Sequence, residues 1–362
     1  VLYIGKHLID ANRDLPNEYT IKQGTLTIAD HAFSGRRSLT SITIPDSVTS
    51  IGKEAFSHCT SLTSITIPDS VTSIGENAFY NCNSLKSITI PDRVTSIGDQ
   101  AFYGCDNLIS VTIGKSVTSI GDRAFEDCNS LESITIPDSV VSIGDSAFSD
   151  CSRLMSVTVG KSVTSIGDRA FEYCNRLYEV YNLSSLTIEK GSTGYGYVGY
   201  HALDVYTSLE ESKLTTTEDG YIFYKNETDY SLLLYTGKET ELTLPDSFNG
   251  SSYRIYNSAF SNCSRLTSII IPDSVISIGS KAFYYCSNLI SISIGKGVTF
   301  IGDSEFDGCN NLASITLPDS VISISKWAFN NTEYYNNRDN WQDGVLYIGK
   351  HLIDANRDLP NE

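Results

Sequence analysis

The stretch SLTSITIPDSVTSIGENAFYNCN, residues 61–83, contains the pattern that decides the fold. SLKSITIPDRVTSIGDQAFYGCD follows at residues 84–106 with every apolar residue, the proline and the glycine at the same places. The same arrangement returns every 23 residues, with an insertion in the copy that begins at Pro245 and a weaker first copy that has Lys22 in place of the proline. A fixed period of this length is typical of a repeat architecture. Eleven copies carry the same phenylalanine: Phe33, Phe56, Phe79, Phe102, Phe125, Phe148, Phe171, Phe260, Phe283, Phe306 and Phe329.

The sequence of a single repeat predicts its secondary structure. The segment LTSITI alternates apolar and polar residues and is rich in β-branched side chains, so we expect a strand at residues 62–67. Pro68 ends this strand because proline cannot donate to a ladder. VTSI predicts a second short strand at residues 71–74 on another side of the coil, and Gly75 turns the chain. The segment ENAFYNC, residues 76–82, predicts a short helical or 3₁₀ turn.

A single coil of this size cannot bury enough apolar surface to offset the conformational entropy of ordering it. Stacking solves the problem, because neighbouring coils share ladder hydrogen bonds and cover each other's flat sides. We therefore predict a β-rich solenoid of about eleven 23-residue coils with parallel sheets, short helical or 3₁₀ turns, and irregular or hairpin insertions.

The consensus L-x-x-I-x-I-P-x-x-V-x-x-I-G-x-x-A-F-x-x-C resembles the BspA-like leucine-rich repeats of bacterial surface proteins. The resemblance covers roughly residues 19–177 and 241–329. It implies a leucine-rich-repeat solenoid with a parallel sheet, secretion or cell-surface display in a bacterium, and adhesion or protein binding. It fixes the fold better than the partner.

The first and last eighteen residues, Val1–Glu18 and Val345–Glu362, are identical. We therefore expect the chain to be a window of a longer series of modules. The predicted organisation is a hairpin segment (1–18), a first repeat array (19–177), an irregular Tyr/Gly-rich island with a β-hairpin (178–240), a second array (241–332) and a second hairpin segment (333–362).

The nine cysteines lie in one column, each three residues after a repeat phenylalanine. Zinc sites need close cysteine pairs, which this spacing does not provide. A disulfide between neighbouring coils is compatible with the expected spacing, but parallel side chains aim poorly at each other. We favour buried free thiols that pack as small hydrophobic groups.

Composition excludes several functions. The net charge of −17 disfavours binding to nucleic acid or anionic membranes, and no apolar run is long enough for membrane insertion. The sequence G-x-G-x-x-G at Gly194, Gly196 and Gly199 lacks the βαβ context of a dinucleotide site, and we interpret it as a surface loop. We find no metal-binding or catalytic motif and predict a protein without cofactor, metal or enzymatic activity.

Recognition must therefore use outward-facing columns. Hydroxyl ladders are expected on the main strand, and exposed tyrosines interrupt the repeat; tyrosine offers rigid amphipathic contact area. The candidate contact residues are Thr66, Thr89, Thr112, Thr135, Tyr80, Tyr103, Tyr173, Tyr284, Tyr285, Tyr195, Tyr197 and Tyr200. We predict a non-catalytic extracellular or cell-surface binding module for a protein or polysaccharide, flanked by neighbouring repeat modules of its parent chain. The alternative is a structural spacer within a larger secreted protein.

Overall fold

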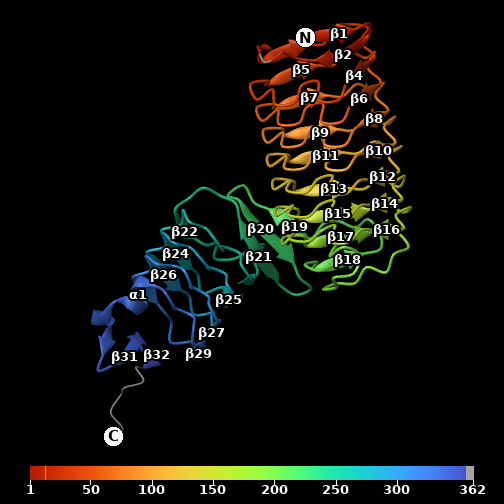
Figure 1. The fold of residues 1–362 in the computed structure, drawn as a ribbon. Coiled ribbons are helices and arrows are strands. Elements are labelled where there is room, and N and C mark those ends of the chain that lie inside the picture. The colour runs from red at the N-terminus through yellow and green to blue at the C-terminus, as the bar shows by residue number, and fades with distance from the viewer. Residues whose placement is uncertain (13, 356–362) are drawn as a thin grey trace. The chain divides into compact units, whose positions relative to one another are not determined.

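The computed structural model describes residues 1–12 and 14–355. These residues form two compact units, which divide after Glu210. Each unit is a stack of short coils whose strands pair with the equivalent strands of the coils before and after (Figure 1). Hydrogen-bonded partners are typically 23 residues apart, so one period of the sequence corresponds to one coil of the stack.

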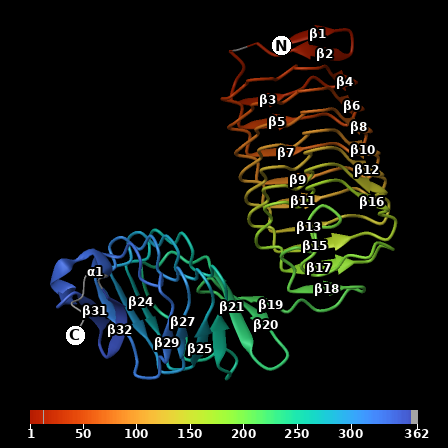
Figure 2. The same ribbon diagram turned by 60° about the horizontal axis from the view of Figure 1, so that its bottom comes forward.

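Unit 1 has two lines of strands along its stack (Figure 2). The seven second strands and the two strands of an N-terminal hairpin form one nine-stranded sheet: β1 (Leu2–Ile4), β2 (His7–Asp10), β4 (Thr27–Ile28), β6 (Ser50–Ile51), β8 (Ser73–Ile74), β10 (Ser96–Ile97), β12 (Ser119–Ile120), β14 (Ser142–Ile143) and β16 (Ser165–Ile166). The main strands are β3 (Glu18–Thr20), β5 (Ser41–Thr43), β7 (Ser64–Thr66), β9 (Ser87–Thr89), β11 (Ser110–Thr112), β13 (Ser133–Thr135), β15 (Ser156–Val159), β17 (Glu179–Asn182) and β18 (Asp204–Tyr206).

Unit 2 begins with the antiparallel strands β19 (Leu214–Thr216), β20 (Tyr221–Lys225) and β21 (Tyr230–Tyr235), which lead into parallel β23 (Tyr253–Ile255) and β25 (Val275–Ile278). Beside them lie β22 (Glu241–Thr243), β24 (Ser268–Ile271), β26 (Ser291–Ile294) and β28 (Ser314–Thr316), and the pair β27 (Phe300–Ile301) and β29 (Ser323–Ile324). The unit ends with α1 (Glu333–Asn336), η1 (Arg338–Asn340), β30 (Trp341–Gln342), β31 (Val345–Ile348) and β32 (His351–Ala355).

The repeat phenylalanines form the centre of each stack. From Phe33 to Phe171 their rings stack nearly parallel, with successive centroids 5.1–5.3 Å apart. A second file runs from Phe260 to Phe329 at 5.2–5.4 Å. All are buried, so every coil shields the aromatic ring of its neighbours. The prediction of one continuous core within each array is confirmed.

The cysteine column lies beside the phenylalanines. Eight of the nine thiols are buried, and each of these sulfur atoms donates a hydrogen bond to a phenylalanine carbonyl in the preceding coil, such as Cys105 Sγ to Phe79 O at 3.3 Å. Burial raises the pKa of the Cys59 and Cys105 thiols to about 12. These cysteines are free and neutral, as the column predicted.

The repeat glycine has a packing reason. A Cβ atom on Gly75 would lie 2.7 Å from the backbone of Gly52 in the preceding coil. Glycine at this corner therefore allows successive coils to approach closely.

Two expectations need correction. The segments equivalent to residues 76–82 are turns rather than helical or 3₁₀ turns, because residues with a left-handed backbone interrupt any helix, for example Asn77 (φ 54°) and Asn81 (φ 55°). The number of coils is about fourteen rather than eleven. Strands β17 and β18 contribute to this difference, since they continue the line of main strands of unit 1 without a repeat phenylalanine.

Candidate interaction surface

The main strands of unit 1 belong to three sheets, and their outer face is a ladder of hydroxyl groups. Thr66, Thr89, Thr112 and Thr135 are exposed on β7, β9, β11 and β13. Thr89 and Thr112 lie directly opposite each other in the parallel register. Within the described chain, these four hydroxyls make no intramolecular hydrogen bond, so they can donate to and accept from a ligand.

Threonines elsewhere on the coil behave differently. Beside the second strand, Thr72 Oγ1 donates to Thr49 O at 3.2 Å, and Thr118 Oγ1 donates to Thr95 O at 3.0 Å. Those hydroxyls support the ladder between coils. The main-strand hydroxyls have no such role, which separates a structural threonine column from one that is available for binding.

Five tyrosines lie one or two residues past a repeat phenylalanine, in a part of the coil that we call the tyrosine ridge: Tyr80, Tyr103, Tyr173, Tyr284 and Tyr285. Tyr80 and Tyr103 are one residue past that phenylalanine, and their rings stack at 4.8 Å with an interplanar angle of 6°. His58 meets Tyr80 edge-on at 5.4 Å. Burial, followed by a hydrogen bond to Asp127, raises the pKa of Tyr103 to about 12.

In two other coils, a tyrosine of this ridge has a left-handed backbone. Tyr173 and Tyr285 lie two residues past their phenylalanines, with φ of 61° and 57°, yet they are 57% and 51% exposed. Tyr285 meets Tyr284 edge-on at 4.5 Å, and the Lys281 ammonium lies 5.3 Å from the Tyr284 ring. Three of the eight candidate tyrosines thus lie on this part of the coil in unit 1, and two lie on the equivalent part in unit 2.

The remaining tyrosines lie in the island. Tyr197 and Tyr200 meet edge-on at 5.7 Å, and Tyr195 and Tyr200 are exposed. The glycine motif of this island serves the stack: Gly196 O accepts from Phe171 N at 2.7 Å, and a Cβ on Gly196 would lie 2.8 Å from that of Ala170. The motif therefore closes a coil instead of forming a phosphate loop.

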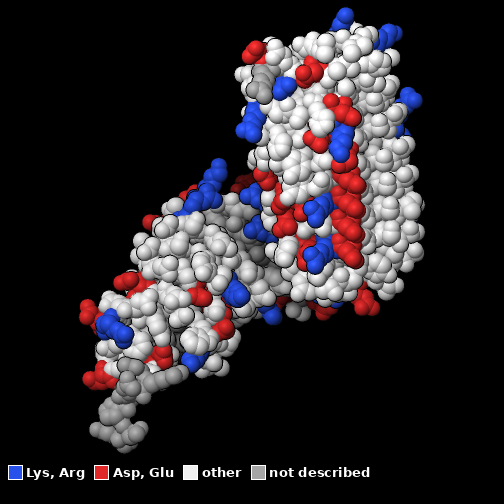
Figure 3. Space-filling model, viewed as in Figure 1, with Lys and Arg blue, Asp and Glu red and all other residues white. Residues whose placement is uncertain are grey.

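A stripe of acidic side chains runs along one side of unit 1 (Figure 3). One column of the repeat supplies Asp99, Asp122, Asp145 and Asp168, and each of the first three accepts a hydrogen bond from the backbone N–H of the next at 2.8–2.9 Å. These carboxylates connect successive coils, so their first role is structural. Their repeated charge also makes this side unfavourable for anionic ligands.

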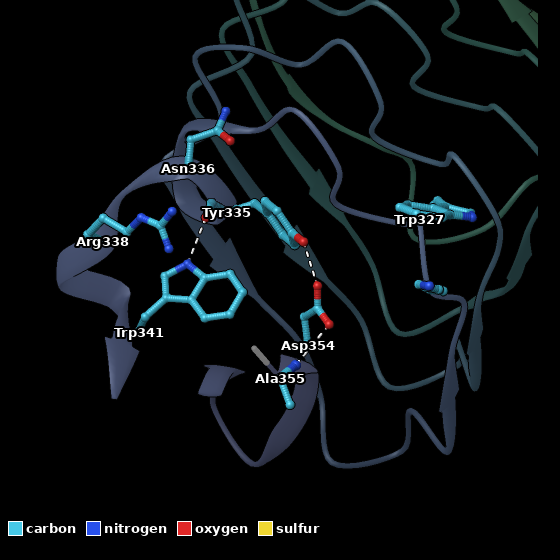
Figure 4. A pocket seen from close by; sticks show the side chains of 8 residues that line it. Trp327, Tyr335, Asn336, Arg338, Trp341, Asp354 and Ala355 are labelled. Carbon is cyan, nitrogen blue, oxygen red and sulfur yellow. Dashed lines mark hydrogen bonds between the residues drawn. The ribbon is translucent and has the colours of Figure 1, made fainter. Parts of the chain in front are cut away.

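A concave site that was not predicted from the sequence, a pocket of about 360 Å³, lies at the end of unit 2 (Figure 4). Both tryptophans of the chain line it, together with Tyr335, Arg338 and Asp354. Trp341 packs edge-on against Tyr335 and donates from Nε1 to Tyr335 O at 2.8 Å, while the Tyr335 hydroxyl donates to Asp354. Two tryptophans close together in the last part of the sequence were the available signal.

We also searched the described residues for metal sites and membrane-spanning helices. In residues 1–12 and 14–355, no three His, Cys, Asp or Glu side chains are placed to hold a metal ion. No helix within this described part is long and apolar enough to cross a membrane.

Stacked coils with a parallel sheet, an outward hydroxyl ladder and a buried phenylalanine file define a leucine-rich-repeat solenoid. The sequence matches the family described as BspA type leucine rich repeat region, in six copies, over residues 12–108, 72–193 and 234–357. The chain belongs to this family.

Solved structures from bacteria are similar to the chain. A leucine-rich repeat protein from Bacteroides ovatus is 28% identical over 87% of this chain and 64% of its own, with a TM-score of 0.39. A leucine rich cell surface protein from Faecalibacterium prausnitzii is 27% identical over 89% of each chain, with a TM-score of 0.34. The leucine rich repeat protein of T. pallidum is 32% identical over 48% of this chain and 80% of its own, with a TM-score of 0.40. The chain thus spans less than two thirds of the B. ovatus structure. No curated protein matches it.

Proposed function

We propose that this chain is a non-catalytic binding module, secreted or displayed at a bacterial cell surface, that presents the tyrosine ridge to a protein or polysaccharide partner. Its membership of a family with bacterial surface proteins supports a binding or scaffold role. The particular surface is inferred from the residues themselves.

The observation that carries the proposal is the placement of Tyr173 and Tyr285. Both have a left-handed backbone, which is unfavourable for bulky residues. Sister coils use Asn81, Gly104 or Asn262 at this position, which suit that backbone better. Since about half of the surface of each tyrosine is also exposed, neither backbone preference nor core packing explains the residue. A contact role does, because exposed tyrosine is an effective anchor in interfaces.

Sister coils also provide the variants that test the ridge. Tyr173→Asn and Tyr285→Asn introduce the residue that the fold uses elsewhere, and Tyr80→Ser and Tyr103→Ser copy Ser57. The four-fold variant and the wild-type chain would be compared on glycan and protein arrays. We expect the variant to lose the wild-type signal at least tenfold while both units remain folded, as thermal unfolding would show.

A matched control alters the hydroxyl ladder and leaves the ridge intact. Thr66→Val, Thr89→Val and Thr112→Val keep the β-branched shape and remove only the hydroxyls. If the threonine variant loses binding and the tyrosine variant does not, the binding site is the hydroxyl ladder instead of the tyrosine ridge. Equal binding by all three proteins would exclude both surfaces.

The structural-spacer alternative has its own support in the uninterrupted aromatic files, which stiffen each unit. Absence of any wild-type signal on both arrays would favour it.

A further inference from the structure

The identical sequences at the two ends fold into the same hairpin. Strand β1 pairs with β2, and β31 pairs with β32, with equivalent partners such as Tyr3 with Leu8 and Tyr347 with Leu352. Both hairpins have an irregularity at the same place, between Leu2 and Tyr3 and between Leu346 and Tyr347. The two copies differ in what each of them covers.

Burial is inverted between the copies. Leu8 is fully buried, whereas its counterpart Leu352 is 57% exposed. On the opposite face, Ile4 is 63% exposed, whereas its counterpart Ile348 is only 1% exposed. The hairpin therefore has two apolar faces, and each copy uses only one of them.

The N-terminal copy covers the coil that follows it. Strand β2 pairs with β4, Ala29 N donates to Leu8 O at 2.8 Å, and Ala11 N donates to Ala32 O at 2.7 Å. The C-terminal copy covers the coils that precede it, and Ile348 belongs to the core of unit 2. Within the described residues, β32 pairs only with β31, so its outer edge is open.

The N-terminal and C-terminal hairpins contact their neighbouring coils through different atoms of equivalent residues. His7 bonds through Nδ1 to Thr27 Oγ1, while His351 bonds through Nε2 to Pro318 O. The other shared residue is an aspartate. Asp10 meets Arg36 through Oδ1, and Asp354 accepts from Tyr335 through Oδ2. One hairpin can thus make both sets of contacts.

The pocket of Figure 4 lies beside the last residues of β32. In the N-terminal copy, Arg36 of the first coil donates from Nε to Ala11 O at 2.8 Å and pairs with Asp10 at 3.4 Å. The counterparts of those two residues, Ala355 and Asp354, line the pocket. Asp354 in this pocket can pair with a guanidinium group, as Asp10 does with Arg36 in the N-terminal copy.

We propose that the C-terminal hairpin is a two-sided cap whose open face docks the first coil, residues 19–44, of a second copy of this chain. The contacts are those that residues 7–11 make to the same coil within one chain, including the Arg36 guanidinium in the pocket. This inference is independent of the proposed binding at the tyrosine ridge.

Within one molecule, the tethered N-terminal hairpin competes for the same coil. Because its sequence is identical and its effective concentration is high, wild-type chains should stay monomeric at ordinary concentrations. Docking in trans requires the N-terminal hairpin to leave, as in a domain swap.

Leu8→Asp tests the proposal because it places a charge at a buried position and unseats the N-terminal hairpin. We expect this variant to form head-to-tail oligomers that grow with concentration in analytical ultracentrifugation. The double variant Leu8→Asp/Leu352→Asp should stay monomeric, but it should form a 1:1 complex with the wild-type chain. Leu2→Asp, on the exposed face of the same hairpin, is the matched control and should stay monomeric.

Thiol reactivity shows whether unit 1 remains folded in these variants, because its cysteines are buried. A folded Leu8→Asp chain that is monomeric, or one that oligomerises equally with Leu352→Asp added, overturns the proposal. If unit 1 unfolds in Leu8→Asp, a tandem chain decides the question. In this chain, residues 345–362 of the first copy also serve as residues 1–18 of the second copy, so the eighteen-residue segment occurs only once between them. The amides equivalent to residues 351–355 should exchange at least tenfold more slowly in the tandem than in the single chain; equal exchange overturns the proposal.

Discussion

At the residue scale, Glu305 breaks the repeat most sharply. It occupies the column that holds Ala282 and Ala328 in the neighbouring coils, and it is completely buried. Its Oε1 accepts from Ala282 N at 3.1 Å, while Oε2 makes no hydrogen bond. Burial raises the pKa of this carboxyl to about 8. Glu305 is therefore a built-in weak point of unit 2.

This weakness has a defined pH dependence. The folded state keeps the Glu305 proton up to a pH of about 8, whereas the unfolded state loses it near the ordinary carboxyl pKa. The folded state binds more protons between these values, so stability falls as the pH rises through this window. Glu305→Ala should raise the free energy of unfolding at pH 9 by roughly 3–5 kcal/mol and have a much smaller effect at pH 4.

Urea titration followed by tryptophan fluorescence is the measurement, since Trp327 and Trp341 both lie in unit 2. Glu305→Gln keeps the size of the side chain and removes its charge, so it serves as the control. An effect of Glu305→Ala that is equal at pH 4 and pH 9 would show that the charge is irrelevant.

The left-handed tyrosines give a second test at this scale. Tyr173→Asn should leave the stability of unit 1 unchanged or raise it by up to about 1 kcal/mol, because asparagine tolerates this backbone better. Thermal unfolding followed by far-UV circular dichroism would measure the change. A loss of more than about 1 kcal/mol would mean that the ring stabilises the fold.

At the element scale, the acidic column combines attraction and repulsion. Each aspartate accepts a backbone hydrogen bond from the next coil, but it also lies close to carboxylates above and below it. Asparagine retains the accepting oxygen and removes the charge. The column therefore allows the two effects to be separated.

Asp122→Asn should raise the melting temperature of unit 1 at low salt, because it relieves repulsion from Asp99 and Asp145 while Oδ1 still accepts from Asp145 N. The gain should disappear at about 1 M salt, where the screening length is about 3 Å. Melting curves at both salt concentrations are the measurement. A lower melting temperature at both would indicate that the charge itself strengthens the hydrogen bond.

The strands of each coil could be predicted from the sequence, but the backbone conformation of the turns could not. The strands at residues 64–66 and 73–74 were predictable because apolar alternation and Pro68 mark them. The left-handed turns were not, since Glu54, Gln100 and Arg123 occupy such positions without the glycine or asparagine that signals them. Neighbouring coils impose this backbone through hydrogen bonds such as Arg123 N to Asp145 O at 2.8 Å.

At the scale of the whole molecule, periodicity predicted the solenoid and its aromatic file but underestimated the number of coils. Coils such as that of β17 lack the phenylalanine and proline, and Val198, between β17 and β18, is buried in the core. The two faces of the terminal hairpin were also invisible in the sequence, because identical residues are buried or exposed according to what lies beside them. Glu305 and the tryptophan pair stood in the sequence as departures from the repeat, and only burial and distance showed their importance.

Each coil is stable only because its neighbours cover it. Double-mutant cycles on the unit 2 file, followed by tryptophan fluorescence during urea unfolding, test this most directly. Phe283→Ala and Phe306→Ala remove rings in contact at 5.4 Å, whereas Phe260→Ala and Phe329→Ala remove rings at the two ends of the file. We predict a coupling energy above about 0.5 kcal/mol for the adjacent pair and additivity for the distant pair. Additive effects in both pairs would contradict the interdependence of the coils.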